Sequence, residues 1–576
     1  MSTTNCIVDM VFADVTALAD AAETNNGSVL STNSLFKAQT AQSDYGTMEL
    51  NQFILDGAKE ILPVSPSDIA FWSSVQSGAD CTFSTNPLFT STFTTTHTSS
   101  GITLTFTGDY PVEIKVTWYS IAGSKLAQKT FYPDSLEYYC QNQVQYYGKI
   151  KIEFIKTRNP YCYIKLQYIL YGVNLQWSKD LVQNGSVVEE IDTTGATISI
   201  NTASVSIVDA YNNFDIGNED GEWKSIEKKQ KITFSEDKDG VKIPCGVFFM
   251  DSWSFSNNIA KFSLKDSVGL MDSFTFYGGA VYSDVKSGVI LDQIFAAAGI
   301  TDYSITAEIY NTTLSGWLAV QTCRSAMQKA LFAVGAVCDD SRSSTVKIYK
   351  ADRYVKYTVP TSRKFAGKTT VSMDTYVSGV SLTYSQYVLQ ADSSQIFSGA
   401  MLKGDTKITF TAPYLASSIM VSAGTIKEVS TNYVIVTMTA DGTCVISGRT
   451  YQANTFTYLE NVPYIESGEI ENVKKFSGET LCNTSILPDI AQSLLSYYLL
   501  RKKVSMQYLI DLEQAGNWVN IVDVSNNYAT SLIEKQTLNL TGGFIATATC
   551  RGYSAKVTED YFTGLELYTG QSIGVL

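Results

Sequence analysis

Short runs in which apolar and polar residues alternate recur along most of this chain, and they limit its fold more than any other feature. The clearest run covers residues 112–119, ValGluIleLysValThrTrpTyr. Successive side chains of a strand point to opposite faces, so this run predicts a strand with one buried and one solvated face. Gly, Asn, Asp and Pro separate such runs, as at Gly108-Asp109 and Asn159-Pro160. The pattern predicts a mainly β protein with a few helices, of the β+α class.

The stretch 315–350 has helical rather than strand periodicity. Its apolar residues recur at helical spacing from Trp317 to Val337, and polar residues at 325–329 fill the opposite side. Gly335 lies where the end of a helix is expected. We therefore expect one long amphipathic helix in this stretch, followed by a short β-unit.

Two further helices are expected. One spans 285–298, with Gly299 as the residue that closes it. The residues expected to face inward from this helix are Val289, Ile290, Leu291, Ile294 and Phe295. The other spans 489–501, and the basic run Arg501-Lys502-Lys503 is expected to complement its C-terminus.

Charge and composition exclude several classes of protein. The formal net charge of −14 argues against nucleic acid as a bound ligand, because phosphate contacts require clustered Lys and Arg. No apolar run reaches transmembrane length, and the N-terminal sequence MSTTNCIVDM does not resemble a secretory signal. The ten cysteines are scattered without a CxxC pair, so we expect buried thiols formed in a reducing cytosol.

The sequence also argues against an enzyme. Residues 570–574, GlyGlnSerIleGly, match the GxSxG elbow, but that motif needs an Asp and a His later in the chain, and the sole histidine is His97. His97 is expected at a strand end. A single histidine without clustered cysteines makes a zinc site improbable. We therefore expect no catalytic residue, no metal and no cofactor.

Pairs of acidic residues are candidate acid/base partners, since a glycosidase needs two carboxylates. The pairs are Glu189-Glu190, Asp237 with Asp239, and Asp339-Asp340. Neighbouring residues of a strand face opposite ways, and these pairs occur in turn-like polar contexts. We expect solvated turn residues, with 237–240 forming a hairpin turn rather than a calcium loop.

Several segments resemble the central hub proteins of bacteriophage tails. They are the stretch 315–350; the hairpin 243–253 with 261–266, which contains Pro244-Cys-Gly246; the helix at 285–298; and the pair 516–522 with Gly542-Gly543-Phe544. Asn517 stands where Asp is usual in that family. Pro244 and Gly246 predict a strand start or bulge, and Asp266 a turn. The resemblance covers 174–552 and implies two tube-like β-barrels flanking a helical region.

The N-terminal β region resembles a different module. Its expected strands are 91–96, 102–107, 112–119, 125–132, 149–155 and 163–171, a spacing typical of a sandwich or barrel. The amino-acid sequences at 71–74, 92–106 and 116–119 resemble those of discoidin-like, galactose-binding-type jelly rolls. Such modules often present aromatic residues to sugars on loops, although core packing is the more common role of Trp and Tyr. The candidate glycan-binding residues are Trp72, Asp109, Tyr110, Tyr139, Tyr147 and Arg158.

A chain of 576 residues is too long for one core, so several domains are expected. They are an N-terminal arm and lead-in strand at 1–58; a discoidin-like jelly-roll β-sandwich at 59–173; the first hub β-barrel at 174–283; a helical α/β hub region at 284–362; a β-rich hub region with an insertion at 363–480; a helix and second hub β-barrel at 481–556; and a C-terminal strap at 557–576.

The resemblance implies a structural virion protein, the central hub of a phage tail tip or baseplate. Such hubs are trimers that adapt a six-fold tail tube to a three-fold tip and gate the channel for DNA ejection. The implied partners are two other copies of the chain, distal tail and tail tube proteins, the tape measure protein, and tip fibre or spike proteins. The implied location is the virion, after synthesis in the host cytoplasm. The alternative is a carbohydrate-binding adhesin that uses the jelly roll to recognise a host surface glycan.

Overall fold

The structure is a computed structural model that describes residues 4–13, 15–25, 71–73, 75–210, 212–218, 223, 226, 230–465, 467–522 and 528–554. The chain divides into two compact units. One comprises Met1–Val8, Trp177–Val208 and Lys231–Leu576, and the other Asp9–Gln176 and Asp209–Gln230. Strands dominate both units, which confirms the mainly β class with a few helices. The predicted lead-in at 45–57, the GxSxG match and the C-terminal strap lie outside the described residues.

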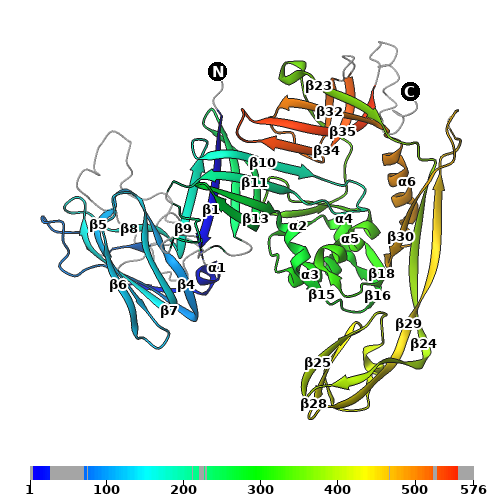
Figure 1. Cartoon of the computed structure of the whole chain (residues 1–576), viewed down its shortest axis with the longest axis horizontal. Helices are drawn as coiled ribbons and strands as arrows, with labels where there is room; N and C mark the ends of the chain where they lie inside the picture. Colours follow the sequence, from blue (N-terminus) through cyan, green and yellow to red (C-terminus); the bar gives the residue numbers. More distant parts are fainter. Residues whose placement is uncertain are drawn as a thin grey trace. The chain divides into compact units, whose positions relative to one another are not determined.

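A 13-stranded sheet forms the framework of the first unit (Figure 1). Its main path has the order β23-β32-β35-β34-β10-β11-β14-β13-β12-β1-β9, and β22 pairs with β33, which pairs with β34. The strands are β1 (Thr4–Ala13), β9 (Gly172–Ser178), β10 (Val182–Glu190), β11 (Thr202–Val208), β12 (Lys231–Lys238), β13 (Val241–Ser256), β14 (Ile259–Lys265), β22 (Val355–Thr358), β23 (Lys364–Met373), β32 (Lys502–Leu509), β33 (Trp518–Val522), β34 (Tyr528–Asn539) and β35 (Ile545–Ser554).

The two strand groups that were expected to form separate barrels are joined edge to edge. β10 pairs antiparallel with β34, from Ser186 opposite Asn539 to Glu190 opposite Lys535. No sheet of the described residues closes into a barrel, so the prediction of two barrels is wrong in this respect. The alternation within a strand shows which of its faces is buried, but it does not show which strand lies beside it.

The hairpin strands β12, β13 and β14 form the antiparallel meander that the sequence predicts. The register of β12 against β13 shifts between Phe234 and Ser235, opposite Gly246 and Pro244, which confirms the predicted bulge. The turn at 237–240 is also confirmed, because Gly240 N donates to Asp237 Oδ1 at 2.8 Å. Asp266, which follows β14, caps the next helix by accepting from Gly269 N at 2.6 Å.

The chain segment that connects the two groups of strands of the large sheet contains short helices and strands, which pack against one another. They are α2 (Ser267–Leu270), η3 (Met271–Ser273), β15 (Thr275–Phe276), β16 (Val281–Lys286), α3 (Ser287–Ala298), β17 (Tyr303–Ile305), α4 (Ala307–Asn311), β18 (Thr313–Trp317), β19 (Gln321–Thr322), α5 (Cys323–Val334), β20 (Val337–Asp339), β21 (Val346–Tyr349) and β31 (Leu481–Cys482). We call the part from β15 to β21 the helical region. Its core is built on the inner faces of α3 and α5.

The helix in the stretch 315–350 is shorter than predicted. α5 begins at Cys323, and the Thr322 side chain accepts from Ser325 N at 3.2 Å as its N-cap. The preceding residues form β18 instead, where Gly316 has φ +134° and a Cβ atom would lie 1.9 Å from the Thr480 carbonyl oxygen. The close approach of residues 480–481 leaves no room for a Cβ atom, and the positive φ also favours glycine. The predicted end is confirmed, since Gly335 adopts the left-handed conformation.

The other two predicted helices are present with small shifts. α3 covers Ser287–Ala298 and ends at Gly299 in the left-handed conformation, as predicted. Four of its five expected inward residues are buried, but Val289 is 37% exposed, so its prediction was wrong. α6 covers Leu487–Tyr498. The basic run that follows it makes ion pairs with more distant acids, Arg501 with Glu469 at 2.7 Å and Lys503 with Asp374 at 3.2 Å.

The region after β23 forms an extended arm (Figure 1). Its elements are β24 (Gly379–Met401), β25 (Gly404–Thr409), η5 (Ala416–Ser418), β26 (Met420–Val421), β27 (Thr425–Val429), β28 (Tyr433–Met438), β29 (Gly442–Asn461) and β30 (Val473–Glu479), and η4 (Thr361–Arg363) precedes β23. β24 and β29 pair along nearly their whole length as an antiparallel ribbon. The base of the ribbon packs on α6, and its far end carries the sheet β25-β28-β27.

The second unit contains a seven-stranded sheet with the order β3-β8-β4-β7-β5-β6, in which β2 also pairs with β4. Its elements are α1 (Val15–Asp20), β2 (Ala22–Asn25), β3 (Phe71–Trp72), β4 (Leu88–Phe106), β5 (Pro111–Tyr119), β6 (Lys125–Phe131), β7 (Glu137–Thr157) and β8 (Lys165–Leu170). The two strands expected at 91–96 and 102–107 are one strand, β4, whose register against β7 shifts repeatedly between Thr92 and Gly101. Trp118, Tyr147 and Tyr171 are among the large buried side chains of its core.

Candidate functional site: the buried polar seam

A charged network lies where β10 meets β34 in the large sheet. Glu189 of β10 is 1% exposed, yet it is surrounded by hydrogen-bond donors. Arg342 Nε donates to Glu189 Oε1 at 2.6 Å, and Ala515 N donates to Oε2 at 3.4 Å. The Gln536 side chain of β34 also donates to Oε2. A buried carboxylate is tolerable only when paired and hydrogen-bonded in this way.

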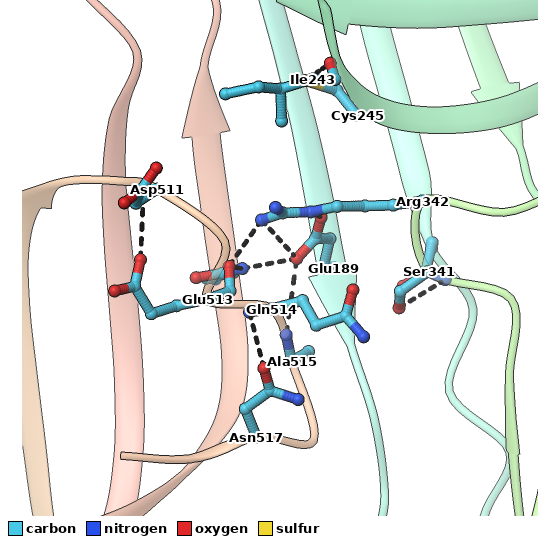
Figure 2. A network of polar contacts seen from close by, with 12 residues as sticks. Glu189, Ile243, Cys245, Ser341, Arg342, Asp511, Glu513, Gln514, Ala515 and Asn517 are labelled. Atoms are coloured by element: carbon cyan, nitrogen blue, oxygen red, sulfur yellow. Dashed lines mark hydrogen bonds and ion pairs between the residues drawn. The ribbon is translucent and has the colours of Figure 1, made fainter. Parts of the chain in front are cut away.

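The loop between β32 and β33 brings a second buried carboxylate to the same place (Figure 2). Glu513 is 1% exposed, and its carbonyl oxygen accepts from Arg342 Nη2 at 2.6 Å and from Gln536 Nε2 at 2.9 Å. Its carboxylate pairs with Arg363 and accepts from Asp511 N at 2.9 Å. Two arginines therefore balance two glutamates. We call this set, Glu189, Arg342, Arg363, Glu513 and Gln536, the polar seam.

The electrostatics of Arg342 show how strongly the seam depends on its pairing. Burial alone lowers the pKa of Arg342, but the charge of Glu189 and its hydrogen bond raise that pKa by more. The net effect is a raised pKa, so the guanidinium remains charged. Arg342 also has φ +54°, an unusual backbone conformation for a non-glycine residue, which the surrounding contacts hold in place.

A pair of buried aspartates lies beside the seam. Asp266 Oδ1 caps α2, while Asp340 accepts from Asn201 Nδ2 at 2.9 Å and from Ser267 N at 3.1 Å. Burial raises the pKa of Asp340 to about 6, and burial together with the charge of Asp340 raises the pKa of Asp266 well above its usual value.

These side chains correct two predictions about acidic pairs. Glu189, Asp339 and Asp340 are 1%, 7% and 5% exposed, so the expectation of solvated turn residues is wrong for them. Glu189 and Asp340 are buried because residues distant in sequence donate to them, and sequence spacing gives no sign of those partners. Asp339 accepts from the nearby Ser341 N at 2.8 Å. The polar seam and the aspartate pair connect segments that are far apart in the sequence. Among the described residues, no group of three or more acidic, His or Cys side chains is placed to hold a metal ion.

The predicted glycan-binding residues divide into two groups. Asp109, Tyr110 and Arg158 lie together: the Arg158 guanidinium is 5.2 Å from the Tyr110 ring centroid, and its Nη1 is 4.0 Å from Asp109 Oδ1. Asn159 Nδ2, which was not predicted, donates to Asp109 Oδ2 at 2.8 Å. The other three residues are placed elsewhere or are not described.

Tyr147 is fully buried and its ring contacts Phe93, so its assignment to a surface site is wrong. The adjacent Tyr146, with φ +57°, is the exposed member of that pair at 68%. Tyr139 is half-buried on β7, opposite Thr103. Trp72 ends β3, and its side chain lies outside the described residues.

His97 forms a clasp that sequence reasoning did not anticipate. It lies inside β4 rather than at a strand end, is 5% exposed, and its Nε2 is 3.0 Å from Asp20 Oδ2 at the end of α1. Asp20 also accepts from Thr94 N at 2.8 Å and from Thr95 N at 2.9 Å. Hydrogen bonds from Thr94 and His97 lower the pKa of Asp20, so the clasp ties α1 to the sheet.

The ten cysteines agree with the expectation of unpaired thiols. All are free, and eight are buried, while Cys81 and Cys338 are half-buried. Burial raises the pKa of Cys550 to about 12, which suppresses its reactivity. No helix of the described residues has the length and apolar character needed to cross a membrane.

Comparison with known proteins gives only distant similarities. No family model matches the chain, and no curated protein is similar in sequence. A tail protein from Neisseria meningitidis MC58 aligns with a TM-score of 0.38 at 11% identity, over 64% of this chain and 92% of that one. The 43 kDa tail protein of prophage MuSo2 from Shewanella oneidensis gives 0.37 at 10%, over 64% and 93%. The prophage tail protein gp18 from Listeria monocytogenes EGD-e gives 0.36 at 9%, over 67% and 99%. Similarity at this level does not assign a function.

Proposed function

We propose that this protein is a structural component of a phage tail, the central hub of its tip or baseplate. The observation that carries the proposal is the β10–β34 junction, which fuses two strand groups far apart in sequence into one sheet. The groups are those that the resemblance to tail hubs identifies as the two tube-like halves. A chain that supplies two such halves can match a six-fold tube with three copies.

The polar seam supports a structural role for the protein rather than a catalytic one. Its carboxylates and guanidiniums satisfy one another across β10, β34 and the loop at 511–515, so no group is left to act on a substrate. A rigid junction is what an adaptor between a tube and a tip needs. In this proposal the chain contacts distal tail and tube proteins, the tape measure protein and a spike or fibre. Its acidic charge lets DNA pass without being held.

Light scattering on the purified full chain tests the stoichiometry. We expect a discrete species at three times the 63.2 kDa of one chain across a concentration series. A dimer or a tetramer would contradict the three-to-six match on which the hub proposal depends. A stable monomer, with and without the tail tube protein, would favour the alternative function described below over the hub.

The alternative is a carbohydrate-binding adhesin, and the cluster of Asp109, Tyr110 and Arg158 favours it. An aromatic ring beside a carboxylate and a guanidinium offers an apolar face with polar partners at its rim. Arg158 has a side chain that is 56% exposed, so a ligand can reach it.

Glycan-array binding by the full chain tests this alternative. We expect Tyr110→Ala and Arg158→Ala to lower binding at least tenfold. Tyr132→Ala, which removes a 65% exposed tyrosine of the same unit, serves as the matched control and is expected to bind normally. Equal binding by all three variants would remove this cluster as a sugar site.

A further inference from the structure

The far end of the arm is a module with its own core. We define the distal module as residues 401–446, which contain β25, β26, β27 and β28 and the adjoining ends of β24 and β29. The side chains of its core are Met401, Phe410, Ile419, Val434, Val436, Met438, Cys444 and Ile446. Because it buries these residues against one another, the module keeps its structure without help from the large sheet.

The ribbon of β24 and β29 is the covalent connection between the distal module and the rest of the unit. Its register is irregular between Leu389 and Ser393, and again between Gln395 and Phe397. Irregularities of this kind locally disrupt the ladder and bend a strand. The side chains at 390–398 are exposed or half-buried. Ile396 and Phe397 pack against the core of the distal module, so the weakly packed part of the ribbon is 390–395.

One side chain of the module is bonded into the helical region. Asn432 is 0% exposed, and its Nδ2 donates to the carbonyl oxygens of Tyr277 at 2.7 Å and Leu318 at 2.8 Å. Its Oδ1 accepts from Trp317 Nε1 at 2.5 Å. The amide thereby binds three groups from outside the module.

The surroundings are shaped for this amide. Gly278 has φ +77°, and a Cβ atom there would lie 1.8 Å from Asn432 Nδ2, so glycine leaves the space that the amide occupies. Beside it, Lys407 Nζ lies 3.8 Å from the Tyr277 ring centroid and 4.3 Å from that of Tyr433. The two rings meet edge to face at 5.6 Å. A cation held by two rings adds to the same contact.

We propose that Asn432 and Lys407 form a releasable latch, which holds the distal module against the helical region while the irregular part of the ribbon acts as its hinge. The side chains that make this contact belong to neither of the two hydrophobic cores, so it can open as a unit while the cores on both sides stay intact. Release would let the module swing away. This inference concerns the arm alone and does not depend on the trimer.

Hydrogen–deuterium exchange of the full chain tests the latch. In the wild type, we expect peptides covering 275–280 and 316–320 to exchange faster than strand β28 and helix α5. Asn432→Ala leaves two buried carbonyls and an indole N–H without their partner, so exchange in those peptides and in 389–397 should rise by about 10- to 100-fold, with β25 and β28 unchanged. Asn454→Ala, at an exposed position of the ribbon, is the matched control and should match the wild type.

Two variants of Lys407 distinguish the contribution of its charge to the latch from that of its aliphatic side chain. Lys407→Met is expected to give a smaller increase than Asn432→Ala, whereas Lys407→Arg retains the charge and should behave like the wild type. Two results would overturn the proposal. Unchanged exchange in Asn432→Ala would show that other contacts hold the module, and joint loss of protection in β25 and β28 would show that Asn432 instead stabilises the module itself.

Discussion

Replacement of Arg342 with methionine is expected to lower the stability of the large sheet by about 3 to 5 kcal/mol. Arg342 and Glu189 have side chains that are 7% and 1% exposed, so the variant leaves a buried carboxylate without its charged partner. Methionine keeps much of the side-chain volume, which limits the contribution from a cavity. The measurement is the midpoint of the urea transition followed by tryptophan fluorescence, to which Trp518 on β33 of this sheet contributes.

Two comparisons identify the cause of that loss. In the double variant with Glu189→Gln, the amide oxygen still accepts from Gln536 or Ala515 but carries no charge, so part of the stability should return. Lys535→Met removes an exposed ion pair at the same junction, between Lys535 on β34 and Glu190 on β10 at 2.7 Å, whose side chains are 50% and 40% exposed. That control should cost less than about 1 kcal/mol. Equal losses for Arg342→Met and Lys535→Met would show that burial of the seam is unimportant.

The second large effect is a dependence of stability on pH that originates in Asp266 and Asp340. Because the folded protein raises the pKa of Asp340 to about 6, it binds more protons than the unfolded chain between about pH 4 and pH 6. Stability from this source is therefore greatest at low pH and falls as pH rises through that window. The loss is about 3 kcal/mol for Asp340, since each unit of pKa corresponds to about 1.4 kcal/mol.

Asp340→Asn should remove the part of this dependence that comes from Asp340. Asp266, whose pKa is raised first of all by its burial, still titrates in the variant. Urea midpoints measured from pH 4.5 to pH 8 should therefore fall for the wild type and fall less steeply for the variant. Asp251→Asn, at an aspartate with a 47% exposed side chain on β13, is the control and should retain the wild-type slope. Parallel curves for Asp340→Asn and the wild type would contradict the assignment.

Local features of this fold could be predicted from the sequence, and pairings between distant segments could not. The bulge at Pro244 and Gly246 and the ends of two helices at Gly299 and Gly335 were predictable, because each depends on the backbone preferences of one or two residues. The start of α5 was not, since apolar spacing continued into β18, where Gly316 packs against β31.

The candidate site shows the same limit. Glu189 and Asp340 resemble surface residues in the sequence, and their burial depends on donors far along the chain, among them Arg342 and Asn201, 153 and 139 residues away. Tyr146 and Tyr147 are neighbours on β7, where the first is 68% exposed and the second is buried, and nothing in their sequence distinguishes the two. Asp109, Tyr110 and Arg158 lie together, and their role in sugar binding stays a prediction.

The β10–β34 junction also affects how the protein folds during its synthesis on the ribosome. Glu190 and Lys535, which meet across it, are 345 residues apart. At roughly 5 to 20 residues per second, β10 is exposed for roughly 20 to 70 seconds before β34 has been synthesised. During that time its free edge presents unpaired N–H and C=O groups to any other strand nearby, including the same strand of a neighbouring nascent chain. Translation speed over residues 190–535 is therefore a determinant of how much of this protein matures without aggregating.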